Sequence, residues 1–209
     1  MSFGLVKHNN NSISAITSAG QLAQGKLTLI KEQTASSSAS ISFVDGSSSV
    51  VLDSTYPIYL FKLINIHPSA SDGFFEINFS TDSGSNYNVA KTTTLFASFH
   101  FESGGAAALN YNTSHDSAQN TGGARIVTSQ GNGSDESFSG EIFLYNPSST
   151  TFVKHFMSRL SVHGSSSVLY DFYSAGYGNT TSAIDGVKFA YASGNIDSGT
   201  IKLYGIKGS

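Results

Sequence analysis

The stretch 56–68 (YPIYLFKLINIHP) constrains the fold of this chain more than any other, because nearly every position in it is apolar. The prolines at both ends, the aromatic and β-branched content and the short length favour a strand over a helix. A strand with one wet face would alternate cleanly between apolar and polar residues, so we predict a central strand with both faces covered. Its apolar side chains occupy both strand phases: Ile58, Leu60, Ile64 and Ile66 on one, and Tyr59, Phe61 and Leu63 on the other.

A β-hairpin is predicted directly after this strand. Residues 71–73 (SDG) form a turn signal, and residues 75–79 (FEINF) alternate as a half-buried strand does. The spacing predicts about nine or ten strands, and no long helix, in an antiparallel β-sandwich or barrel. Further strand segments occur at residues 26–34, 40–44, 93–102, 140–146, 151–163, 168–173, 187–191 and 200–206, with two shorter candidates at 109–112 and 124–128.

Residues 1–25 differ from the rest of the chain. They are rich in polar and small residues, with isolated apolar points that include Leu5, Ile13 and Ile16. Two interpretations stay open: a disordered tail, or a short N-terminal arm that docks onto a neighbouring subunit through those apolar side chains. The segment also lacks the apolar run of a signal peptide, because Lys7 is followed by polar residues. We therefore expect a protein that does not pass through a secretory membrane by that route.

The composition limits the classes of partner. Charged residues make up only 12% of the 209 residues, and the net charge of −3 provides no basic footprint for nucleic acid. No segment approaches the ~18 consecutive apolar residues of a membrane span. Cysteine is absent, so a disulfide framework is excluded. We expect neither nucleic acid nor a membrane among the partners.

Motifs for catalysis or metal binding are missing from the sequence. It contains no G-x-S-x-G elbow, and its histidines have no HExxH or H-x-H spacing. Residues 80–87 (STDSGSNY) follow the loose pattern of an Asp-box turn, which we interpret as structural because Asp82 can cap its own backbone. Asp135 and Glu136 lie in a Gly-rich loop that does not match a calcium-binding loop.

Paired carboxylates for glycoside hydrolysis need two acids across a cleft. Glu76, Glu102 and Glu141 lie on predicted strands, but the sequence alone does not bring any two of them together. We therefore assign no catalytic, cofactor-binding or metal-binding residue, expect no cofactor, and predict that the protein is not an enzyme.

Five segments together resemble a group of mostly uncharacterised structural proteins encoded by tailed bacteriophages, especially marine ones. They are residues 27–42 (LTLIKEQTASSSASIS), 59–73 with its INIHPSASDG end, 140–156 (GEIFLYNPSSTTFVKHF), 175–185 (AGYGNTTSAID) and 199–206 (GTIKLYGI). These are strand and turn segments without a catalytic signature, so the resemblance transfers no active-site residue. It implies a virion component with a jelly-roll-like domain.

We therefore predict an all-β protein: an antiparallel β-sandwich of jelly-roll type over residues 26–209, preceded by a short N-terminal arm at residues 1–25. It would be located in the virion as a structural protein of a phage particle, either capsid-decorating or on another part of the virion surface, and would act by self-association and docking onto the particle lattice. Its partners would be copies of itself, with a trimer as the expected form, and major capsid or tail proteins. The alternative is a tail-associated carbohydrate- or receptor-binding module, in which Tyr111, Tyr173 and Tyr177 stack on host surface glycans.

Overall fold

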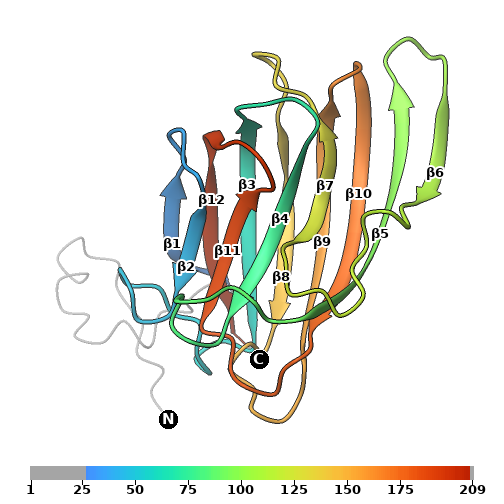
Figure 1. Ribbon diagram of the computed structural model, residues 1–209. Helices are drawn as coiled ribbons and strands as arrows, with labels where there is room; N and C mark the ends of the chain where they lie inside the picture. The colour runs from blue at the N-terminus through green and yellow to red at the C-terminus, as the bar shows by residue number, and fades with distance from the viewer. Residues whose placement is uncertain (1–26, 208–209) are drawn as a thin grey trace, which may run out of the picture.

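The computed structural model describes residues 27–207, and β-strands are the only regular secondary structure among them (Figure 1). The all-β prediction is confirmed, with twelve strands where about nine or ten were expected. Residues 1–25, predicted as an arm, lie outside the described residues. The strands are β1 (Leu27–Thr34), β2 (Ile41–Val44), β3 (Ile58–Pro68), β4 (Gly73–Ser80), β5 (Lys91–Phe101), β6 (Ala107–Tyr111), β7 (Ala124–Gln130), β8 (Phe138–Tyr145), β9 (Lys154–Gly164), β10 (Val168–Gly178), β11 (Gly186–Tyr191) and β12 (Ile196–Ile206).

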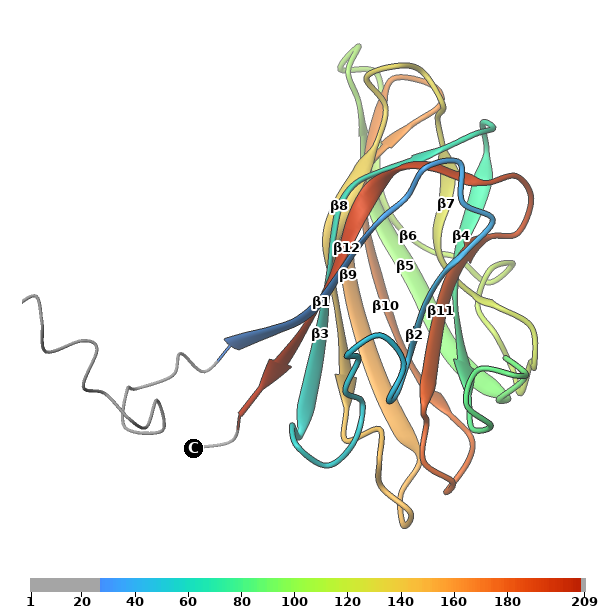
Figure 2. The ribbon, with the colours of Figure 1, turned by 90° about the vertical axis from the view of Figure 1, so that its left-hand side faces the viewer.

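All strand pairs are antiparallel, as predicted, and they form one connected sheet that folds back on itself. A long run of eight strands has the order β1-β12-β3-β8-β9-β10-β5-β6, and a short run of four has the order β7-β4-β11-β2. The two runs are joined through a single residue pair between β7 and β9, Gln130 with Gly164. In Figure 2 the runs face each other with the core between them.

A cluster of aromatic rings connects the two runs. The ring centroid of Phe189 on β11 lies 5.2 Å from that of Phe61 on β3, 6.1 Å from that of Phe75 on β4 and 6.4 Å from that of Phe43 on β2. All four rings are fully buried. Each occupies the inward phase of an alternating strand, so the period-two pattern of the sequence brings them together between the runs.

Strand β3 is central, between β12 and β8, but only its inner face is covered by another layer. Phe61 and Ile66 are fully buried in the core, whereas Ile64 is 40% exposed. A bulge at Asn65, whose φ is 51°, shifts the register, so that Ile66 and not Ile64 joins the inner face. The prediction that both faces are covered is therefore wrong, because the outer face packs only against neighbouring side chains of the same face, as Leu60 does.

Several strand boundaries differ from the prediction, and the ends of β10 and β9 show why. Strand β10 continues to Gly178, beyond the predicted strand segment 168–173, because β5 and β9 pair with it on both sides along its full length. Phe152 lies in the segment 151–163 that the sequence predicts as a strand, but it precedes β9 and is 70% exposed. Its N–H is donated to the hydroxyl of Ser149 in a turn, so it takes no part in the sheet.

Candidate functional site on the outer face of the long run

A row of charged side chains crosses the outer face of the long run. The Nζ of Lys202 lies 2.9 Å from Glu32 Oε2, and the Nζ of Lys62 lies 3.5 Å from Glu141 Oε2. The hydrogen bond and the charge of Glu32 raise the pKa of Lys202 above its ordinary value. Exposed pairs of this kind contribute only about 0–1 kcal/mol of stability each, so their main effect is to neutralise the face. The strand register places five residues side by side in this charged row: Glu32, Lys202, Lys62, Glu141 and Arg159.

Arg159 connects the charged row to a ladder of aromatic rings. Its guanidinium donates from Nη2 to Asp171 Oδ2 at 2.8 Å, and its Cζ lies 5.1 Å from the ring centroid of Tyr173. The hydrogen bonds and the charge of Asp171 raise the pKa of Arg159. On the other side, Tyr173 stacks parallel to Phe96 with the ring centroids 5.0 Å apart. Both faces of the Tyr173 ring are therefore occupied by neighbouring protein groups.

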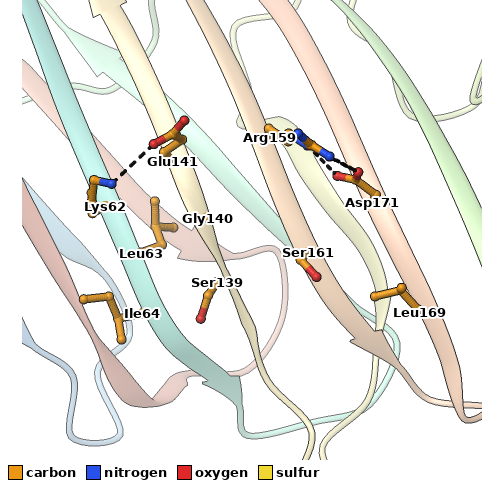
Figure 3. A pocket seen from close by; sticks show the side chains of 10 residues that line it. All are labelled: Lys62, Leu63, Ile64, Ser139, Gly140, Glu141, Arg159, Ser161, Leu169 and Asp171. Atoms are coloured by element: carbon orange, nitrogen blue, oxygen red, sulfur yellow. Dashed lines mark hydrogen bonds and ion pairs between the residues drawn. The ribbon is translucent and has the colours of Figure 1, made fainter.

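An open hollow lies between these pairs (Figure 3). It has a volume of about 510 Å³ and spans β3, β8, β9 and β10. Lys62 and Glu141 border it on one side, and Arg159 and Asp171 border it on the other, with Ile64 at its edge. Because each charged group faces an oppositely charged partner, the hollow presents no net charge. This arrangement is better suited to contact with a protein surface than to capture of a small ion.

An exposed apolar patch adjoins the charged row. Leu29 is 50% exposed and Met157 is 53% exposed. Strand spacings of about 4.8 Å and a rise of about 3.4 Å per residue give the patch a footprint on the order of 300 Å², a size often associated with function. The apolar patch consists of two neighbouring rows on β1, β12, β3, β8 and β9: the exposed Leu27, Leu29 and Met157, the partly exposed Ile58, Phe143, Tyr145, Tyr204 and Ile206, and the buried Leu60 between them.

The three tyrosines proposed for glycan stacking do not form a common platform. Tyr173 is enclosed by its neighbours, and Phe96 separates it from Tyr111 in the same cross-strand row. Tyr111, on the edge strand β6, donates its hydroxyl to Asp116 Oδ2 at 2.8 Å. Tyr177 lies near the C-terminal end of β10, where its ring centroid is 6.0 Å from that of His155. The alternation of the sequence could not reveal that the three rings lie apart and that Tyr173 is enclosed, because the free faces of a ring depend on its cross-strand neighbours.

The candidate acidic residues are likewise separated. Glu76 Oε1 lies 3.9 Å from Arg125 Nε, and Glu102 Oε1 lies 3.2 Å from His163 Nε2, while Glu141 belongs to the charged row. Burial raises the pKa of Glu76, although the charge of Arg125 opposes this effect. No two of the three glutamates flank one cleft. Within residues 27–207 no three His, Asp or Glu side chains form a group able to hold a metal ion.

The turn at residues 80–87 is stabilised by its own side chains. Asp82 Oδ1 accepts hydrogen bonds from the Asn86 N–H and the Ser80 hydroxyl, and Oδ2 accepts one from the Asn86 side-chain amide. These bonds lower the pKa of Asp82. Gly84 adopts a φ of 78°, which glycine tolerates without strain. The hydrogen bonds agree with the structural interpretation of this Asp-box-like segment.

Among residues 27–207 there is no helix long and apolar enough to cross a membrane. Comparison of the chain with protein-family models, curated proteins and solved structures finds no match. The resemblance to phage structural proteins therefore stays a prediction.

Proposed function

We propose that this chain is a structural protein of a bacteriophage particle, displayed on the virion surface as capsid decoration. It acts by binding copies of itself, with a trimer as the expected form, and by docking onto the lattice of major capsid or tail proteins. The observation that carries this proposal is the apolar patch, which lies on an open sheet face. Contiguous apolar patches of a few hundred Å² are often functional, and contact with another protein is one such function, which supports the proposal.

The strand pairing supports a β-sandwich of jelly-roll type. When the hairpins β5–β6 and β9–β10 are set aside, the other eight strands pair from the chain ends inward: β1 with β12, β2 with β11, β3 with β8 and β4 with β7. A nested hairpin of this kind, rolled into facing sheets β1-β12-β3-β8 and β7-β4-β11-β2, has jelly-roll connectivity. Viral capsid domains and lectins use this fold, so it favours a virion role by analogy and assigns no residue.

The outer face has the properties that self-association requires. Apolar surface buried at an interface contributes roughly 25 cal/mol per Å², whereas association costs an estimated 4–15 kcal/mol. A stable interface buries about 800 Å² on each partner, so it must extend beyond the apolar patch onto the charged row. The charges of that row are already paired with one another, so a second copy meets no excess of like charge.

Sedimentation of the purified protein tests the self-association. We expect an oligomer whose population rises with concentration, and we expect Met157→Glu to shift it to monomer, because an unpaired carboxylate buried in an apolar contact costs several kcal/mol. Leu109→Glu is the matched control, since Leu109 is 68% exposed on β6, away from the patch. It should leave the oligomer intact. A wild-type monomer at every concentration, or equal dissociation by both variants, contradicts a role for the patch.

Location in the particle is tested with gold-labelled antibodies against residues 26–209. Capsid decoration predicts labelling distributed over the heads of intact particles. Labelling confined to the tails would favour the alternative of a tail-associated module. If purified particles neither bind the antibody nor contain the chain by mass spectrometry, the proposal of a virion protein is wrong.

A further inference from the structure

The two strand runs differ in width, and this difference leaves a cleft under the overhanging end of the long run. Strands β10, β5 and β6 extend past β7, the last strand of the short run (Figure 1). The cleft lies between the inner face of these three strands, Thr128 and Ser129 of β7, and His115 in the β6–β7 connection. Its volume of about 530 Å³ lies within the range of small-molecule sites.

Aromatic rings form the floor of this cleft. Tyr170 and Phe172 line it, and alternation along β10 directs the intervening Asp171 to the opposite face. Phe99 of β5 is the cross-strand neighbour of Tyr170, with the ring centroids 6.0 Å apart. Tyr170 is only partly buried, so part of its ring remains accessible to a ligand.

Neutral hydrogen-bonding groups line the sides of the cleft. Asn110 and Asn112 contribute from the β6 side, and Thr128 and Ser129 contribute from β7. Amide groups both donate and accept hydrogen bonds, as hydroxyl groups do. None of the described residues that line the cleft carries a permanent charge.

His115 adds a neutral donor. Its Nδ1 lies 2.8 Å from Arg125 Nη1, and because a guanidinium only donates, Nδ1 must accept and the ring proton must be on Nε2. Burial and the charge of Arg125 lower the pKa of His115 below its ordinary value of 6.5, so the imidazole is neutral at pH 7.

We propose that this cleft binds a neutral saccharide. A pyranose ring has a face of C–H groups that packs on aromatic rings and an edge of hydroxyls that donate and accept hydrogen bonds. Tyr170 and Phe99 offer the first kind of contact, and Asn110, Asn112 and His115 offer the second. None of the residues between 27 and 207 that line the cleft offers a positive charge to an acidic sugar, so the lining favours a neutral one. The cleft is on the opposite face of the long run from the apolar patch, so this proposal does not depend on self-association.

The binding is tested by saturation-transfer NMR and calorimetry with maltotriose, cellotriose, laminaritriose, mannotriose and chitotriose, and with trigalacturonate as the charged probe. We expect at least one neutral trisaccharide to bind saturably with a Kd of about 1 mM or lower, and trigalacturonate not to bind. Tyr170→Leu and Asn110→Ala should each weaken that binding about tenfold.

Matched controls lie on the other face of the same strands. Tyr173→Leu on β10 and Ser98→Ala on β5 point away from the cleft and should change the Kd by less than about twofold. Asn110 is exposed on β6, so its variant tests the cleft without disturbing the core. The proposal is overturned if no neutral probe saturates, if trigalacturonate binds as well, or if the cleft and control variants weaken binding equally.

Discussion

Phe189→Ala should lower the free energy of unfolding by about 3–5 kcal/mol, the range for removing a large buried aromatic ring. Phe189 is fully buried and contacts rings from β2, β3 and β4, so its loss opens a cavity shared by both strand runs. A domain of this size has a stability of about 5–15 kcal/mol, so the variant loses a large part of it. Urea unfolding followed by tyrosine fluorescence measures the change.

The control for this prediction is Phe152→Ala, which makes the same chemical change at a side chain that is 70% exposed. We expect it to change the free energy of unfolding by less than about 0.5 kcal/mol. If the two variants are destabilised alike, the aromatic cluster does not hold the two runs together.

Lys91→Met should remove a rise in stability that the wild-type protein shows in alkaline solution. Lys91 is fully buried, and its ammonium donates to the carbonyl of Val89 and to Asn78 Oδ1. Burial lowers its pKa from 10.5 to about 8, against the opposing charge of Glu76. Between these two pKa values the unfolded chain binds more protons than the folded chain, so stability increases with pH. The difference between the two pKa values corresponds to about 3 kcal/mol in the free energy of unfolding, and the wild-type protein gains this stability between pH 8 and pH 10.5.

The measurement is urea unfolding of both proteins across this pH window, compared as a difference curve. Lys154 is also buried with a lowered pKa, and burial raises the pKa of Tyr191, which makes stability fall above about pH 10. Both groups are present in both proteins and cancel in the difference. If the free energy of unfolding varies with pH in the same way for wild type and Lys91→Met, the Lys91 ammonium is solvated in the folded state and the prediction is wrong.

The strands themselves could be predicted from local pattern. Residues 75–79 and 187–191 alternate in sequence, and they form β4 and β11 with the predicted faces inward. Alternation is a property of neighbouring residues in any strand, whichever strand pairs with it. The prediction failed at the end of β10, where Gly176 and Gly178 weaken the local pattern but β5 and β9 supply hydrogen bonds on both sides.

The sequence by itself determined where most of the strands lie, that the chain is all-β, and that it lacks recognised catalytic motifs. Only the tertiary structure decided which of those residues share a surface. Glu32 and Arg159 belong to one charged row because the irregularity after Leu29 sets the register of β1 against β12, and a shift by one residue would reverse the faces. The cleft exists because the hairpins β5–β6 and β9–β10 widen one run and not the other. Register, pairing partner and run width depend on contacts between residues distant in the chain, which local periodicity does not encode.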